Sequence, residues 1–393
     1  MRRRIIYSLI LAIMIVPVYA QDNVASVLNQ IESNSTTLSA IRQQIEAQKI
    51  ENRTDIFLND PEVEFSYLWG KPSEIGTQRE LSVTQSFDFP TAYAHRSKIS
   101  KMRNNNLELQ YKSERLNILL NAKQICINIA YNNALNKEYE ARLENAQQIA
   151  KSYQSRFDAG DASILEKNKA LINLTTVENE KKLIDIERKT LLSELKALNG
   201  GIEITFDDTE ILNAPISSDF NSWYADAEIK SPTLQYLSQQ IDIDKQQVKL
   251  NTALSLPKFT AGYASEKTFG EDFKGITVGI SIPLWENKNK VKLAKAQVKS
   301  TELLLEDSKL QFYTHLQQLH KTTFGLQESA QTYRSSILNN NNEELLKKAL
   351  DAGQISLIEY LLESEYYYDV KNKMLEAERD FNLSLTELRA VEL

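Results

Sequence analysis

The sequence predicts a mainly α-helical fold with a small β part. The predicted fold repeats one unit: helix, β-hairpin, long helix, turn and helix. A turn whose two copies lie 193 residues apart indicates this duplication. The matching residues are Asp158, Ala159, Gly160, Ser163 and Glu166 in one copy, and Asp351, Ala352, Gly353, Ser356 and Glu359 in the other. The low content of helix breakers, 11 glycines and 8 prolines in 393 residues, favours long helices.

Residues 1–20 are expected to be a signal peptide that is cleaved after Ala20. Three arginines precede an apolar stretch, which ends in small residues. No cysteine lies near this site, so we expect no lipid anchor at the new N-terminus. No later stretch has about 18 consecutive apolar residues, so a membrane crossing by the mature chain would use strands.

Changes in apolar periodicity place the elements of the first repeat, residues 21–201. A spacing of three or four residues predicts helices, and strict alternation predicts strands. The expected elements are a helix from Val24 to about Leu58, strands at about 62–70 and 78–89, a long helix at about 91–157, a tip turn at 158–163 and a helix to Leu198. The long helix would measure roughly 100 Å at about 1.5 Å per residue.

A short connector, residues 202–222, precedes the second repeat at 223–393. This repeat has the same order of patterns. The expected elements are a helix from Trp223 to about Leu254 with a break near Ser231, strands at about 258–266 and 275–283, a long helix at about 289–351, a tip turn at 351–356 and a final helix to about Val391.

Each predicted strand has one apolar side and one mostly polar side, because side chains alternate along a strand. We expect the apolar sides to face lipid at Val63, Phe65, Tyr67, Trp69, Phe87, Tyr263, Val278 and Ile280. We expect the polar sides to face a lumen at Ser82, Thr84, Thr277 and Ser281. A hairpin packed on a soluble core would show the same alternation, so that alternative stays open here.

Strands of about 9–11 residues have the length that crosses an outer membrane. Four strands cannot close a barrel, however, and an open sheet edge cannot lie in lipid. Three copies would supply twelve strands. The pattern therefore predicts a trimeric 12-stranded β-barrel that continues into a long α-helical tunnel.

With this order of elements the chain resembles the TolC-type outer-membrane efflux proteins, the outer membrane factors of tripartite efflux and type I secretion systems. The resemblance covers essentially the whole mature chain. It rests on the duplicated order, on residues 160–166 and 353–359, and on four prolines beside the strands: Pro61, Pro90, Pro257 and Pro283. It implies a homotrimer in outer-membrane lipid with a large periplasmic part. Such a channel passively conducts substrates received from a periplasmic adaptor and an inner-membrane pump.

The resemblance also implies roles for the two turns. The adaptor-docking tip would comprise Asp158, Ala159, Gly160, Ser163, Asp351, Ala352, Gly353 and Ser356. Glu166 and Glu359, six residues after the tip glycines, are the candidates for a pore constriction. They could equally be solvated first-turn residues beside helix N-termini. The family's basic residue two positions after the second glycine is Ile355 here, so its ionic lock is not carried over.

Other classes of function find less support. The net charge of −7, about −10 without the signal peptide, argues against nucleic acid. We predict no catalytic set, cofactor or metal site, and we expect His95, His315 and His320 at the surface. A periplasmic adaptor or a secreted coiled-coil protein would explain the helices. The duplicated unit disfavours the adaptor, and the strands with lipid-like faces disfavour the coiled-coil protein.

Overall fold

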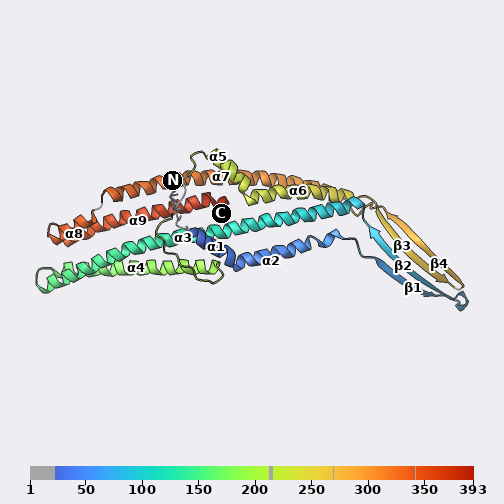
Figure 1. Cartoon of the computed structure of the whole chain (residues 1–393), viewed down its shortest axis with the longest axis horizontal. Coiled ribbons are helices and arrows are strands. Elements are labelled where there is room, and N and C mark those ends of the chain that lie inside the picture. The colour runs from blue at the N-terminus through green and yellow to red at the C-terminus, as the bar shows by residue number, and fades with distance from the viewer. Residues whose placement is uncertain (1–22, 212–215, 269, 341) are drawn as a thin grey trace, which may run out of the picture.

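The structure is a computed structural model, and it describes residues 23–211, 216–268, 270–340 and 342–393. The helices form a long rod with a sheet at one end (Figure 1). The expected signal peptide lies outside the described residues, as does part of the expected connector.

The first repeat has the predicted order of elements. It consists of α1 (Asn23–Asn34), α2 (Thr36–Glu51), β1 (Glu62–Trp69), β2 (Thr77–Phe87), α3 (Pro90–Asp158) and α4 (Ile164–Leu198). Pro90 is the first residue of α3, a position where a missing backbone N–H breaks no helical bond. No glycine or proline follows until Gly160, and α3 accordingly runs unbroken for 69 residues.

The second repeat follows the same order with more interruptions. It consists of α5 (Phe220–Lys230), α6 (Pro232–Ala253), β3 (Lys258–Thr268), β4 (Glu271–Ser281), α7 (Lys290–Asn339), α8 (Glu343–Asp351) and α9 (Leu357–Leu388). The predicted break near Ser231 is present, because Ser231 ends α5 and its hydroxyl accepts from the backbone N–H of Leu234 in α6.

Two helices that were predicted as continuous are divided. The first breaks at Ser35, whose hydroxyl accepts a hydrogen bond from the backbone N–H of Leu38, and it ends at Glu51 rather than near Leu58. The helix predicted at 289–351 stops at Asn339, and α8 restarts at Glu343. Asparagine is a poor helix former, and acidic residues stabilise a first helical turn. The run of asparagines followed by glutamates therefore favours a new helix start.

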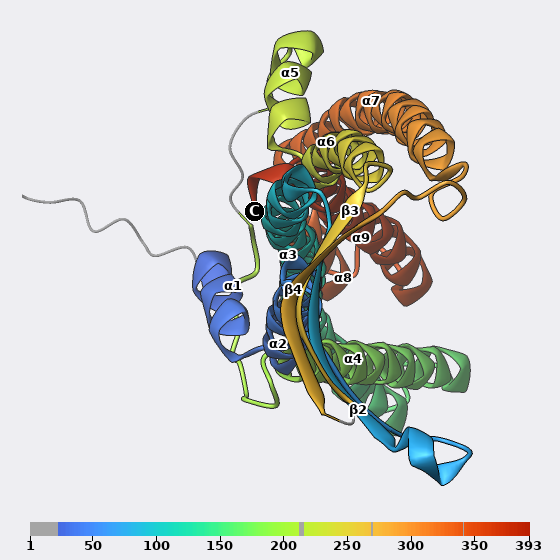
Figure 2. The same cartoon turned by 90° about the vertical axis from the view of Figure 1, so that its right-hand side faces the viewer.

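The four strands form one antiparallel sheet in the order β1-β2-β3-β4. The pairing of β2 with β3 joins the two repeats, so the sheet is one structure rather than two hairpins. Figure 2, viewed from the strand end, shows the sheet nearly edge-on as a thin curved layer. The predicted strand 78–89 ends two residues early at Phe87. The last two strands lie nearer the hairpin turn than predicted, at 258–268 and 271–281.

The core consists of several small clusters along the rod. Helix α3 is the central element and contacts α4, α6 and α9. One cluster joins Ile31, Ile129, Leu195 and Phe206, and it also contains the fully buried Cys126. No helix in the described part of the chain is both long and apolar enough to cross a membrane.

Candidate functional sites: the sheet and the helical tip

The pairing register sorts the strand residues onto two faces. One row across the sheet contains Val63, Val83, Tyr263 and Ile276, and another contains Phe87, Phe259 and Ile280. Since side chains alternate along a strand, every second residue in each direction shares this face. All eight residues predicted to face lipid lie on it: Val63, Phe65, Tyr67, Trp69, Phe87, Tyr263, Val278 and Ile280.

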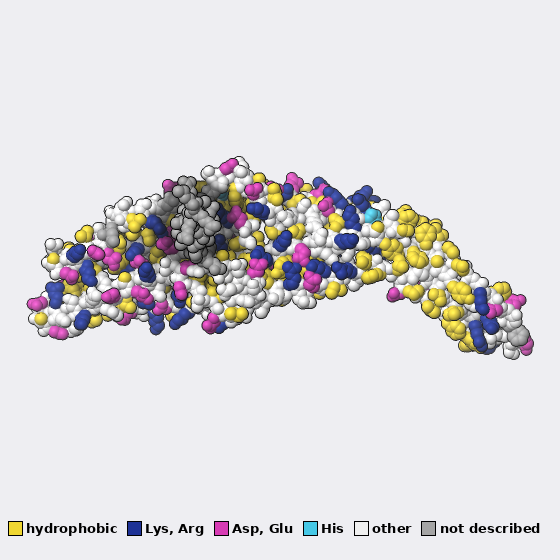
Figure 3. Space-filling view, in the orientation of Figure 1, with side chains coloured by type: hydrophobic (Ala, Val, Ile, Leu, Met, Phe, Trp, Pro, Cys, Tyr) yellow, Lys and Arg dark blue, Asp and Glu magenta, His cyan; other side chains and the backbone are white. Residues whose placement is uncertain are grey.

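No other part of the described chain covers this apolar face. Ile276 is 84% exposed and Val278 is 82% exposed, values that a core position would not have. Figure 3 shows hydrophobic side chains gathered over the strands. Exposed tryptophans flank the band, with Trp285 beyond the helix end of β4 and Trp69 near the free end of β1. A packed soluble hairpin would bury these residues, so the structure disfavours that alternative.

The opposite face is polar and crowded. It contains Ser82, Thr84, Thr277 and Ser281, the residues predicted to face a lumen. A Cβ atom at Gly262 would lie 2.7 Å from Thr277 Oγ1 and 3.2 Å from Thr84 Oγ1. The small glycine therefore lets the polar side chains of neighbouring strands pack closely. Five glutamates also lie on this face: Glu62, Glu64, Glu80, Glu266 and Glu271.

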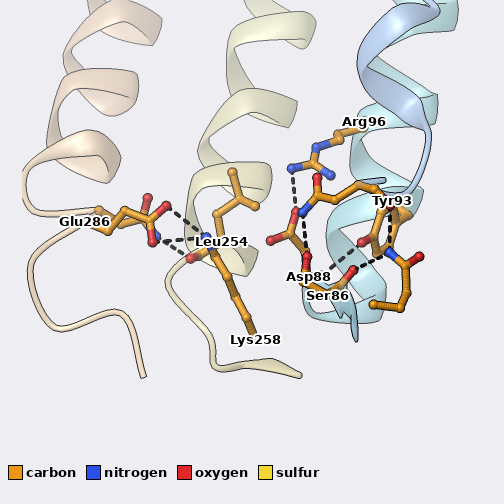
Figure 4. A network of polar contacts seen from close by, with 10 residues as sticks. Ser86, Asp88, Tyr93, Arg96, Leu254, Lys258 and Glu286 are labelled. Carbon is orange, nitrogen blue, oxygen red and sulfur yellow. Dashed lines mark hydrogen bonds and ion pairs between the residues drawn. The ribbon is translucent and has the colours of Figure 1, made fainter. Parts of the chain in front are cut away.

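Short polar contacts fix the junction between β2 and α3 (Figure 4). Arg96 Nη2 donates to Asp88 Oδ2 over 2.6 Å, and the backbone N–H of Asp88 donates to Tyr93 Oη over 2.9 Å. Asp88 is only 5% exposed, which makes this ion pair part of the interior. These contacts explain why β2 ends at Phe87: the next residue is held by the first turns of α3.

A second junction lies between α6, β3 and the segment after β4 (Figure 4). Lys258 Nζ donates to both carboxylate oxygens of Glu286, over 2.9 and 3.0 Å. Asn287 Nδ2 donates to the carbonyl oxygen of Leu254. The strands of both repeats are thus bonded to segments beside the helices, which favours a fixed angle between sheet and rod.

The two turns at the other end of the rod have the same backbone structure. The N–H of Asp161 donates to Arg156 O over 2.7 Å, and the N–H of Gln354 donates to Ala349 O over 2.9 Å. Gly160 and Gly353 have φ values of +82° and +68°, the left-handed conformation that such a helix end requires. All eight predicted docking residues, from Asp158 to Ser163 and from Asp351 to Ser356, are exposed.

The two candidate constriction residues bond to the ends of their own helices. Ser163 Oγ accepts from the N–H of Glu166, whose carboxylate in turn accepts from the N–H of Ser163 over 2.7 Å. Ser356 and Glu359 repeat this capping box, with 2.8 Å for the second bond. Hydrogen bonds from Ser163 and Ser356 hold the pKa values of Glu166 and Glu359 below their usual range. This arrangement matches the alternative of first-turn residues that stabilise a helix start.

Both turns lie at the same end of the molecule (Figure 1). One hydrophobic cluster joins the helices beside them, with Tyr153 and Ala170 from the first repeat and Leu350, Leu357 and Tyr360 from the second. The predicted meeting of the two turns at one tip is therefore present in the fold.

A groove above this tip gave no signal in the sequence, and both polar and apolar side chains line it. The groove has a volume of about 760 Å³ and lies over α3, between α4 and α9. The buried guanidinium of Arg142 packs between the rings of Tyr139 and Tyr368, and it donates to Asn372 Oδ1 over 2.8 Å. These contacts join α3 to α9, so they link the two repeats. Arginine in an amphipathic helix gives no sequence signal for burial.

The three histidines differ in their surroundings. No cluster of three or more potential metal ligands occurs among the described residues. The expectation of a surface position is wrong for His320, which is buried. Its ring packs on Phe220 and Phe324, and its Nε2 lies 2.8 Å from the carbonyl oxygen of Ser217.

The fold is that of the TolC-type outer-membrane channels. It is similar to VceC of Vibrio cholerae, with a TM-score of 0.72, 14% sequence identity and coverage of 94% of this chain and 95% of that chain. The Campylobacter jejuni CmeC outer-membrane channel has a TM-score of 0.71 and 16% sequence identity, with coverage of 94% of this chain and 85% of that chain. CusC, whose structures show conformational changes that accompany folding and transmembrane channel formation, has a TM-score of 0.79 and 14% sequence identity, with coverage of 95% of this chain and 92% of that chain. No protein-family model and no curated protein sequence matches the chain.

Proposed function

We propose that three copies of this chain form an outer-membrane channel, the exit duct of a tripartite efflux pump. The channel conducts substrates passively from a periplasmic adaptor and an inner-membrane pump to the exterior. One observation carries this proposal: a four-stranded sheet with an uncovered apolar face stands at the end of a rod of helices. Lipid is the solvent that such a face requires, because about 25 cal/mol is gained for each Å² of apolar surface removed from water.

The strand directions suit closure by three chains. β1 and β4 are the edges of the sheet, and each has one strand neighbour among the described residues. They run in opposite directions, so β4 of one copy can pair with β1 of the next in the same antiparallel manner. Three copies give twelve strands, an even number as in bacterial outer-membrane barrels. Closure satisfies the edge N–H and C=O groups, which lipid cannot do.

The polar face would then line the lumen of the barrel. The helices below continue the wall, with α3 as a stave between neighbours on both sides. An excess of carboxylates on the polar face favours cations in the lumen, since acidic rings attract cations in a narrow passage.

The tip is the proposed docking site for the adaptor. Its eight exposed residues are accompanied by the exposed apolar side chains of Leu165 and Ile358, the second residues of α4 and α9. A partner helix could bury these side chains against the two turns. Glu166 and Glu359 are proposed primarily as helix caps, while their carboxylates stay accessible enough for a pore-lining role to be tested by substitution.

The trimer and its membrane location can be tested together. Outer-membrane fractions should contain the chain, and a detergent extract should give a compact trimer that migrates as a monomer after boiling. A water-soluble monomer in the periplasmic fraction would refute the channel. Deletion of the chain should also leave its cognate pump unable to export. An adaptor or a secreted coiled-coil protein would not yield a heat-modifiable membrane trimer.

A further inference from the structure

Three cationic side chains meet at the free end of the apolar face. They are Arg79 on β2, Lys267 on β3 and Lys274 on β4. The register places Arg79 directly opposite Lys267, and Lys274 one row closer to the helices. Figure 3 shows Lys and Arg side chains gathered beyond the hydrophobic surface of the strands.

Charges are sorted between the two faces of the sheet. The apolar face has these three cations and one carboxylate, Asp272, whereas the polar face has five glutamates and one lysine, Lys258. The apolar face therefore has a net positive charge at its free end, although the whole chain is acidic.

The positive charge is only partly neutralised within the chain. Asp272 lies opposite Lys267 in the register, but its carboxylate pairs with Lys274 Nζ over 3.1 Å. Among the described residues, no carboxylate lies within ion-pair distance of Arg79 or Lys267. Like charges directly opposite each other destabilise a sheet. An anion placed between these two groups would remove that repulsion.

The surroundings indicate which anion this is. The same face is mostly apolar toward the helices, with Leu81, Val83 and Phe87 along β2, and Leu81 to Phe87 spans roughly 20 Å at about 3.4 Å per residue. Aromatic side chains lie beside the cations: Arg79 stacks 5.3 Å over the ring of Tyr67, which contacts the ring of Trp69. Aromatic and cationic residues next to an apolar band are typical of a membrane interface.

We propose that Arg79, Lys267 and Lys274 bind the phosphate groups of lipid headgroups in the membrane leaflet at the hairpin end, while the acyl chains of the same lipids cover the adjacent apolar rows. Arginine and lysine are the side chains that bind phosphate, arginine through a planar, bidentate fork. A free phosphate ion has no acyl chain and would leave the adjacent apolar side chains uncovered. This inference rests on the proposed membrane insertion.

The test uses the purified trimer in an uncharged detergent, titrated with lipid A that has two phosphates. The dissociation constant for lipid A should rise with salt concentration, because salt screens exposed charges. The variant Arg79→Gln/Lys267→Gln/Lys274→Gln should bind roughly tenfold more weakly or worse. A matched control, Lys151→Gln/Lys182→Gln/Lys189→Gln, removes three exposed lysines of α3 and α4 and should bind like the wild type.

Two further ligands identify what is recognised. Phosphatidylcholine, whose phosphate is neutralised by its own choline, should bind alike to wild type and variant, and inorganic phosphate should compete poorly with lipid A. Equal lipid A affinity in wild type and variant would overturn the inference, and so would full competition by inorganic phosphate. Outer-membrane fractionation separates this failure from that of the channel itself. If the wild type inserts as a trimer and the triple variant binds lipid A equally well, only the lipid site is refuted. If the wild type forms no inserted trimer, both the lipid site and the channel are refuted.

Discussion

Replacing Val278 by arginine should prevent insertion of the sheet. Val278 is 82% exposed, and it lies between the row of Ile280 and the row of Ile276 on the apolar face. This places it near the middle of the band rather than at either aromatic end. An arginine on the lipid side costs about 2–4 kcal/mol at the midplane. The central position favours the upper half of this range, and a trimer would incur the cost three times.

The matched control is Thr277→Arg, which changes the neighbouring residue on the opposite face. Its side chain would enter the proposed lumen, where water and glutamates accommodate a cation. The assay is folding into lipid vesicles across a urea titration, read by the heat-modifiable shift of the trimer. Val278→Arg should move the transition to lower urea, and Thr277→Arg should leave it within error. Equal shifts for the two variants would show that the apolar face does not contact lipid.

Four other outcomes are expected. Gly353→Trp should form normal trimers that fail to export, because nothing lies within 4 Å of a Cβ there and the left-handed backbone costs only about 1–2 kcal/mol; normal export would remove the turn from the docking site. Arg96→Met should lower the free energy of unfolding by about 3 kcal/mol, because it leaves the buried carboxylate of Asp88 unpaired. Loss of the exposed Lys258–Glu286 pair should cost under about 1 kcal/mol. Equal midpoints of chemical denaturation for the two variants would contradict this expectation. Glu359→Gln should reduce the cation selectivity of the wild-type channel in planar bilayers at low salt if the residue lines the pore, and an unchanged reversal potential would assign it to the helix cap alone. Because the cap lowers the folded-state pKa of Glu359, its stabilisation is present above the ordinary glutamate pKa of about 4.3 and is lost as pH falls below it, so amide exchange at the start of α9 should accelerate in acid beyond its intrinsic pH dependence in the wild type but not in Glu359→Gln.

The duplicated order, the faces of the strands and the two turns could be predicted because each has a local signal. Alternation fixes the face of a strand without knowledge of its neighbours. A glycine followed three residues later by serine, and then by glutamate, predicts a helix end and a capped restart.

Interruptions in long helices were harder to predict. The apolar period continues across Ser35, so the cap signal of Ser35 was weaker than the periodicity. At residues 339–344 the asparagines and glutamates contained the signal, but the surrounding apolar pattern suggested one helix. In both places a short polar motif competes with a longer periodic one.

Features that depend on two distant segments had no signal in the sequence. His320 is buried in part because Phe220, from the preceding α5, packs on it. Arg142 acquires its second aromatic neighbour from α9. Likewise, the meeting of Arg79 with Lys267 requires the register between strands of different repeats, which the fold determines.

Because the sheet has two open edges, formation of the proposed trimer should depend steeply on the concentration of the chain. A single chain exposes backbone groups on β1 and β4, because no further strand covers either edge within the part of the chain that the structure describes. If only the closed trimer is stable, its population rises with the third power of the chain concentration, as mass action requires for obligate oligomers. Chains at low abundance would then stay unassembled, while a modest rise in expression would shift most of them into the proposed trimer. The amount of working channel would thus respond to gene dosage more steeply than the amount of protein.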